Sequence, residues 1–284
     1  MATIINGKET ARRVRGEVAG QVASLRDKGI SVKLTVIQVG DDPASTIYVR
    51  NKERACSDTG IESEIIRLDK AVTQEDLLCE ISRLNGDDSV DGILVQLPLP
   101  DHLDEQTVKE AIDPRKDVDG FHPLNTGRLL AGEEALLPCT PAGIIRLLDE
   151  YEIPIEGSHC VVIGRSQIVG KPMAVLLLER NATVTVCHSH TRDLASHTRQ
   201  ADILISAVGR PKMVGAEYVK EGAVVIDVAI NRSDDGKLCG DVDFDAVSPV
   251  CTAITPVPGG VGPMTVAMLL MNCLTAAKRK AVVL

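Results

Sequence analysis

A glycine-containing turn in the second half of the chain has the composition of a phosphate-binding loop. Residues 164–170 read Gly-Arg-Ser-Gln-Ile-Val-Gly, directly after a hydrophobic run and before a segment with helical periodicity. Glycine lets the backbone approach a ligand closely, and the N-terminus of the following helix offers free N–H groups to a pyrophosphate. Because Ser166 stands where the usual G-x-G-x-x-G pattern has its middle glycine, the spacing leaves two interpretations open: a dinucleotide site, or a strand–turn–helix connection without a ligand.

The end of the next predicted strand indicates which dinucleotide would bind. A fold that prefers NAD usually has an acidic residue here, which holds the 2′-hydroxyl of the adenosine ribose. This chain reads Cys-His-Ser-His-Thr at residues 187–191, with no carboxylate. Ser189 and Arg165 could instead bind a 2′-phosphate through charge-assisted hydrogen bonds, so the sequence favours NADP. The cysteine and two histidines of this segment could alternatively bind a metal, but no fourth ligand follows at a recognisable spacing, and we expect no metal site.

Polar side chains in the first half of the chain lie where α/β sheets form ligand sites. Gln96 ends a hydrophobic run, and ligands bind at the carboxyl ends of parallel strands. A polar amide in such an apolar run needs a hydrogen-bond partner. Tyr48 and Lys52 are four residues apart and so share one face of a helix, and Asp117 and Asp119 alternate before a glycine. Ordinary explanations also exist, namely a solvated surface lysine and an Asx turn at the glycine.

A rigid loop near the C-terminus is difficult to explain as a plain linker. Residues 255–265 read TPVPGGVGPMT and lead directly into a helix that we expect to begin at Pro263. Glycine at several positions lets the backbone of such a loop close on a flat ligand.

The elements that would position these residues alternate between strand and helix. Strands are predicted at 33–40, 62–69 and 91–100, separated by helices. The third strand is hydrophobic throughout its centre, which is typical of a parallel strand covered on both faces. A second series of strands and helices begins at residue 159, after a helix that Thr140 and Pro141 would open. The chain is therefore predicted to have an α/β fold.

The two series predict two lobes with a cleft between them. Residues 1–140 would form one domain, completed by a C-terminal helix at 264–284. Residues 141–263 would form a Rossmann-like domain that binds NADP.

Composition limits the class of protein. The 284 residues carry 31 basic and 40 acidic side chains, a net charge of −9, which argues against a nucleic-acid partner because affinity for phosphate backbones comes from clustered Lys and Arg. The eight cysteines are scattered without a C-x-x-C pair, as in proteins of a reducing compartment such as the cytoplasm. With three Tyr, two Phe and no Trp, the core must be aliphatic.

Neither terminal region reads as a signal for export or membrane insertion. The N-terminus carries charges where a signal peptide would have its apolar run. Residues 246–277 are uncharged but interrupted by prolines and glycines, and the remaining stretch, 264–277, is shorter than the roughly 18 to 20 apolar residues of a membrane span. We therefore expect a soluble protein that does not bind membranes.

Five segments together resemble the bifunctional methylenetetrahydrofolate dehydrogenase and methenyltetrahydrofolate cyclohydrolase family. In chain order they are YVRNK, VQLPLP, KDVDGF, GRSQIVGKP and TPVPGGVGPMT. The match extends from about residue 6 into the C-terminal helix and so covers essentially the whole chain. This resemblance implies that the protein oxidises 5,10-methylenetetrahydrofolate with NADP and hydrolyses the methenyl product to 10-formyltetrahydrofolate. It also implies a homodimer.

The resemblance further implies roles for individual residues. Lys52 would be the central catalytic residue, a general base or proton shuttle, and Gln96 would hydrogen-bond to it. Asp119 would hold the pterin ring, and Tyr48 would stack on the folate. The remaining folate-binding positions would be Gly262 and Pro263. The positions that match NADP-binding residues are Gly164, Arg165, Ser166, Ser189 and Ile230.

One position departs from the family pattern. Many members read D-V-G-I-N where this chain has Ala229 in place of the glycine, and a positive φ there would make the Cβ costly and weaken cofactor binding. The chain is also too short for the formate ligase domain of larger members.

Two other functions remain as alternatives: a two-domain NADP dehydrogenase acting on a shikimate-like or amino-acid substrate, and an inactive homologue that binds folate or nucleotide.

Overall fold

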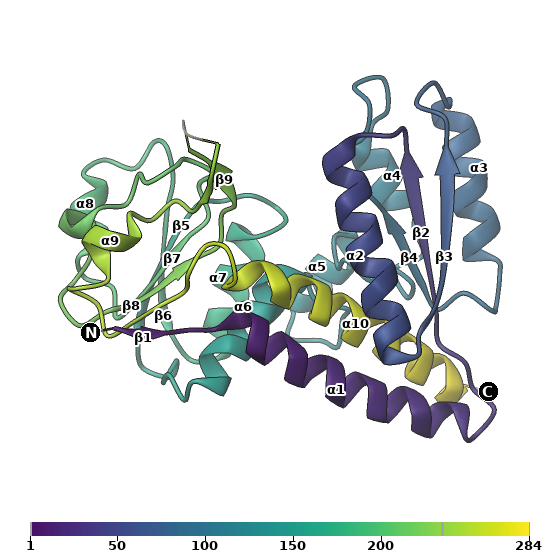
Figure 1. The fold of residues 1–284 in the computed structure, drawn as a ribbon, viewed down its shortest axis with the longest axis horizontal. Helices are drawn as coiled ribbons and strands as arrows, with labels where there is room; N and C mark the ends of the chain where they lie inside the picture. The colour runs from purple at the N-terminus through teal and green to yellow at the C-terminus, as the bar shows by residue number, and fades with distance from the viewer. Residues whose placement is uncertain (1, 234–235, 284) are drawn as a thin grey trace. The chain divides into compact units, whose positions relative to one another are not determined.

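The computed structural model describes residues 2–233 and 236–283, and its chain divides into two compact units (Figure 1). The six-stranded unit comprises Met1–Ala11 and Thr140–Thr265, and the three-stranded unit comprises Arg12–Cys139 and Val266–Leu284. Each unit is named for its own parallel sheet. The predicted α/β class with two domains is therefore confirmed.

The three-stranded unit is a parallel sheet covered on both faces. Its strands, in the order β3-β2-β4, are β3 (Glu62–Leu68), β2 (Lys33–Val39) and β4 (Gly92–Val95). Its helices are α2 (Pro43–Thr59), α3 (Gln74–Asn85), α4 (Glu105–Ala111) and α5 (Pro123–Leu130). Leu34 and Val36 of β2 pack in one core cluster with α2, whereas Ile37 and Val39 pack in another with α3 and α4. Successive side chains of a strand point to opposite faces, so both faces of the central strand are buried in apolar side chains.

The sheet of the six-stranded unit has the order β1-β11-β8-β7-β5-β6, and all of its paired strands are parallel. These strands are β1 (Thr3–Ile4), β11 (Ala253–Ile254), β8 (Val224–Asp227), β7 (Ile203–Ser206), β5 (His159–Ile163) and β6 (Thr183–Cys187). The same unit holds a separate antiparallel pair, β9 (Asn231–Arg232) with β10 (Leu238–Cys239). Its helices are α6 (Cys139–Glu150), α7 (Gly170–Glu179), α8 (Leu194–Thr198), the short 3₁₀ helix η1 (Ala216–Tyr218) and α9 (Phe244–Val247). The chain leaves β5 toward β6 on one side, and β7 pairs on the other side of β5. This reversal of strand order is the point at which open α/β sheets bind ligands.

Residues 2–11 belong to the six-stranded unit, whereas the predicted division placed them with residues 12–140. Thr3 and Ile4 of β1 pair with Ala253 and Ile254 of β11. A two-residue strand cannot be recognised from periodicity, because alternation becomes a signal only over about four to eight residues.

The C-terminal helix is longer than the sequence predicted. Helix α10 runs from Val261 to Val283 rather than beginning at Pro263, and by length and composition it could cross a membrane. The expectation that its apolar part is too short for a span is therefore wrong. Over half of the candidate span is buried, and Leu270 and Leu274 pack in one core cluster with Val18 of helix α1 (Gly7–Arg26). Its apolar composition is thus that of a core helix.

Candidate functional site

The start and end of helix α2 determine where Tyr48 and Lys52 lie. The carboxylate of Asp42 accepts a hydrogen bond of 2.7 Å from the Ser45 N–H, and Pro43 is the first helical residue, as is common at helix N-termini. Gly60 ends the helix with a left-handed φ of 74°. Tyr48, with 47% of its surface exposed, lies one turn before the partly buried Lys52.

Lys52 and Gln96 lie 44 residues apart in the sequence and are in direct contact. The Lys52 amine donates a hydrogen bond of 2.9 Å to Gln96 Oε1. Gln96 follows β4, where its backbone N–H donates to the Ile37 carbonyl, and its side-chain Nε2 donates to the Leu97 carbonyl at 2.6 Å. Because the amide nitrogen is engaged by Leu97, the amide oxygen faces the lysine. Lys52 is therefore the hydrogen-bond partner of the polar amide at the end of this buried strand.

The two aspartates of the DVDG segment have different environments. Asp117 is buried and accepts hydrogen bonds from the N–H groups of Phe121 and His122 and from Asn125 Nδ2. Asp119 is only partly buried, and no hydrogen bond within the described part of the chain engages its carboxylate. The turn-forming role expected of this segment thus belongs to Asp117, which leaves Asp119 available for a ligand.

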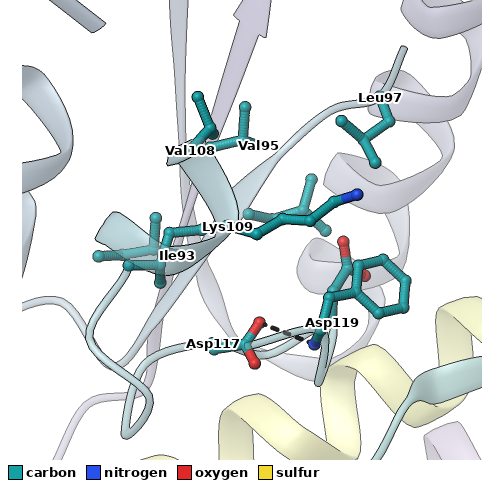
Figure 2. Close-up of a pocket in the computed structure, with 10 residues that line it drawn as sticks. Ile93, Val95, Leu97, Val108, Lys109, Asp117 and Asp119 are labelled. Atoms are coloured by element: carbon teal, nitrogen blue, oxygen red, sulfur yellow. Dashed lines mark hydrogen bonds between the residues drawn. The ribbon is translucent and has the colours of Figure 1, made fainter. Parts of the chain in front are cut away.

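Asp119 lines a small cavity of about 20 Å³ in the three-stranded unit (Figure 2). Lys109, Phe121 and the apolar end of β4 complete the walls. Burial raises the pKa of Asp119 from 3.8 to about 6, although the positive charge of Lys52 opposes the shift. The carboxylate is therefore ionised at neutral pH in surroundings that favour its neutral form.

A larger cavity of about 440 Å³ lies in the six-stranded unit, at the carboxyl ends of three neighbouring strands. Residues 164–166 after β5, residues 188–191 after β6 and residues 207–210 after β7 contribute to its walls. The described lining residues include two arginines, Arg165 and Arg210, and no carboxylate. The structure thus brings Gly164, Arg165, Ser166 and Ser189 together around one space that suits an anionic ligand.

The glycine turn is held by close backbone contacts. A Cβ on Gly164, whose φ is 126°, would come within 2.4 Å of the Ala207 carbonyl oxygen, so only glycine fits. Ser166 Oγ accepts hydrogen bonds from the N–H groups of Val169 and Gly170 at 3.2 and 3.3 Å. The serine in the middle position of the motif thus satisfies free donors at the start of α7, and its hydroxyl proton remains free for a phosphate oxygen.

The alternative of a metal site at residues 187–191 lacks support in the geometry. Among the described residues, no group of three His, Cys, Asp or Glu side chains could hold a metal ion. Cys187 is buried, which raises the pKa of its thiol. His188 Nδ1 accepts a hydrogen bond from the His190 N–H, so one ring nitrogen is already engaged.

Ile230 and Gly262 are neighbours within the six-stranded unit. Ile230 follows β8 with 47% of its surface exposed, and a Cβ on Gly262 would lie 3.3 Å from Ile230 Cδ1. Pro263 follows in the first turn of α10 and is partly exposed. Ala229 does not have a positive φ, so the strain considered for its Cβ is absent.

Two buried carboxylates were not recognised from the sequence. Asp241 is completely buried and holds the loops that follow β7 and β8. Its carboxylate accepts hydrogen bonds from the N–H groups of Val208, Gly209 and Arg210, from Ser206 Oγ and from Asn231 Nδ2. Asp227 accepts from the N–H groups of Asp241 and Val242, and burial raises its pKa to about 7. The only signal in the sequence was an aspartate at the end of a hydrophobic run.

The fold and these two groups of residues define the class of the protein. A parallel sheet with a glycine turn and a basic cavity at its switch point is a dinucleotide-binding domain, and the second unit carries a lysine, an amide and a carboxylate suited to an organic substrate. The chain is thus a two-domain α/β enzyme of the NAD(P)-binding class.

Comparison with known proteins identifies the family. Residues 5–119 match the catalytic domain, and residues 138–281 the NAD(P)-binding domain, of tetrahydrofolate dehydrogenase/cyclohydrolase. The bifunctional protein FolD of Bacillus anthracis is 56% identical over 283 residues, which cover 100% of this chain and 99% of that protein. The chain belongs to the tetrahydrofolate dehydrogenase/cyclohydrolase family, and it accordingly has both dehydrogenase and cyclohydrolase activity in one-carbon folate metabolism.

Solved structures agree with this assignment. The FolD enzyme of Campylobacter jejuni is 51% identical with a TM-score of 0.97, covering 98% of this chain and 99% of that one. The enzyme of Trypanosoma brucei, solved with NADP and an inhibitor, is 41% identical with a TM-score of 0.93, covering 99% of this chain and 98% of that one. The alternatives of a dehydrogenase for another substrate and of an inactive homologue are therefore set aside.

Proposed function

We propose that the chain oxidises 5,10-methylenetetrahydrofolate with NADP and that Lys52 and Gln96 form the centre of its catalytic site. The observation that carries this proposal is the 2.9 Å hydrogen bond from the Lys52 amine to an amide oxygen whose orientation Leu97 sets. NADP, when bound, accepts the hydride that leaves the methylene carbon. Gln96 holds the amine at one position, because a long lysine side chain otherwise samples many rotamers.

Lys52 serves the second reaction as a proton carrier. Hydrolysis of the methenyl product requires water to attack the bridging carbon, loss of a proton from that water, and cleavage of the bond to the leaving nitrogen. Lys52 accepts the proton released by the water and supplies one to the nitrogen, and the excess proton passes to solvent. The product is 10-formyltetrahydrofolate.

Asp119 and Tyr48 bind the folate. An ionised carboxylate can accept two N–H hydrogen bonds from the aminopyrimidine edge of a pterin, and the carboxylate of Asp119 is not used elsewhere in the described structure. The exposed ring of Tyr48, one helical turn before Lys52, stacks on the flat ring system. Gly262 and Pro263 also contact the substrate.

The six-stranded unit binds NADP. Gly164 and Ser166 hold the pyrophosphate, while Arg165 and Ser189 hold the 2′-phosphate. Ile230 lies beside the nicotinamide. The absence of a carboxylate from the described walls of the cavity supports NADP over NAD, because an acid would repel the phosphate. The enzyme works in the cytoplasm as a homodimer.

An absorbance assay tests the proposal. Methylenetetrahydrofolate with NADP should produce reduced cofactor, and preformed methenyl substrate should decay faster than in buffer. Lys52→Met should abolish the accelerated decay and leave NADP binding unchanged, whereas Arg54→Gln, an exposed change on the same helix, should alter neither. No reduced cofactor with either NADP or NAD would refute the oxidation, and full cyclohydrolase activity in Lys52→Met would refute the role of the lysine.

A further inference from the structure

The proposed cofactor contacts leave one side chain of the pocket without a role. Arg210 follows β7 and lines the same cavity as Arg165 and Ser189. No hydrogen bond or ion pair within the described part of the chain holds its guanidinium, although its backbone N–H donates to Asp241 Oδ1 at 2.8 Å. The side chain is exposed toward the pocket, and the backbone beneath it is fixed.

The positions of the phosphate groups limit where the adenine ring can lie. If the glycine turn after β5 holds the pyrophosphate and Ser189 after β6 holds the 2′-phosphate, the base attached to the same ribose must face the remaining walls of the cavity. On the side of the loop after β7, those walls include Leu194, Val208, Arg210 and Met213. None of the chain's Tyr or Phe residues is among the described lining residues. The imidazole of His188 also lines the cavity, but it precedes Ser189 on the side assigned to the 2′-phosphate, and its Nδ1 accepts a hydrogen bond from the His190 N–H.

We propose that the guanidinium plane of Arg210 stacks on the adenine of the cofactor, an inference that rests on the proposed binding of NADP. A guanidinium is planar, is weakly hydrated and stacks on aromatic faces. On this side of the pocket it takes the place that a Tyr or Phe ring could fill, since neither is among the described lining residues. Because the adenine is common to NAD and NADP, Arg210 contributes equally to both, whereas Arg165 distinguishes them.

The loop that carries Arg210 is fixed before any ligand arrives. The Asp241 carboxylate accepts hydrogen bonds from three successive N–H groups, those of Val208 at 2.7 Å, Gly209 at 3.3 Å and Arg210 at 2.8 Å. A loop held in this way loses little conformational entropy on binding. Only the Arg210 side chain has to become ordered when the base stacks on it.

Calorimetric binding of ADP-ribose, NAD and NADP tests the inference. Arg210→Gln should weaken all three ligands by the same factor, about 3- to 30-fold. Arg210→Lys retains the charge without the plane and should recover less than half of the loss on a logarithmic scale. Arg199→Gln, an exposed arginine outside the pocket, is the matched control and should bind all three ligands like the wild type. Circular dichroism checks that each variant is folded.

Three results would overturn the stacking. The first is an unchanged affinity of Arg210→Gln for ADP-ribose. The second is a loss of affinity confined to NADP, which would place Arg210 on the 2′-phosphate. The third is full recovery of affinity in Arg210→Lys, which would show that the charge suffices. Failure of the wild-type protein to bind NADP would be a different outcome, because it would refute the proposed cofactor and the inference with it.

Discussion

Replacing Asp119 by asparagine should stabilise the folded protein while it weakens folate binding. Burial raises the pKa of Asp119 from 3.8 to about 6. A shift of roughly two pH units corresponds to about 3 kcal/mol of unfavourable ionisation in the folded state. Because the side chain is partly exposed, solvent screens part of this energy, and we expect roughly 1.5 kcal/mol of added stability at pH 7. Asparagine keeps the shape of the side chain and removes the charge.

This gain in stability should depend on pH in a defined direction. An unfolded aspartate titrates near pH 3.9, whereas the folded Asp119 titrates near 6. Between these values Asp119 holds more protons in the folded protein than in the unfolded chain, so its contribution to the wild-type free energy of unfolding falls as the pH rises from about 4 to about 6. The advantage of Asp119→Asn should therefore appear over this range and remain constant above it.

Urea unfolding followed by circular dichroism measures the effect, since the chain has no Trp to report by fluorescence. The exposed Asp101→Asn change is the control and should have the same unfolding midpoint as the wild type at pH 4.5 and again at pH 7.5. In parallel, the KM of Asp119→Asn for methylenetetrahydrofolate should rise at least tenfold, because one N–H acceptor becomes a donor. The reasoning would be refuted if Asp119→Asn exceeded the wild type in free energy of unfolding by the same amount at pH 4.5 and pH 7.5, or if it were less stable than the wild type at pH 7.5.

Three further substitutions test the remaining contacts. Gln96→Leu removes the hydrogen-bond acceptor of the Lys52 amine and should lower the cyclohydrolase kcat about 10- to 100-fold, as measured by decay of the methenyl substrate. A normal rate would contradict the proposal that Gln96 positions Lys52. Arg165→Gln should weaken NADP about 10- to 100-fold and NAD less than twofold in steady-state kinetics, and equal losses would place Arg165 away from the 2′-phosphate. Asp241→Asn turns an amide NH₂ toward buried donors and should lower the free energy of unfolding by about 3–5 kcal/mol in urea. If Asp241→Asn lowered the free energy of unfolding by less than about 1 kcal/mol, the loop after β7 would not depend on the Asp241 carboxylate.

Local patterns in the sequence were sufficient to predict the elements around the cofactor turn. The hydrophobic run at β5, the glycine at 164 and the helical periodicity after it each act over a few residues, and the structure forms strand, turn and helix there. The apolar centre of β4 likewise predicted a strand covered on both faces. The pairing of residues 3–4 with β11 and the early start of α10 were missed, because a two-residue strand and a helix start within a Pro- and Gly-rich loop carry no periodic signal.

The sequence by itself determined the α/β class, the family and the residue types available for chemistry, because these depend on local periodicity and on motifs within single segments. Only the tertiary structure decided which distant groups meet. Lys52 and Gln96 come into contact because α2 and β4 pack in the same unit. Asp241 lies beneath the loop after β7 because its backbone is hydrogen-bonded to Asp227 at the end of β8, the neighbour of β7 in the sheet. Strand order and register are set by the burial of apolar faces across the whole unit. Many apolar segments could be buried equally well at a given place in the sheet, so their order cannot be derived from the segments alone. A polar side chain's partner therefore cannot be identified from its own segment.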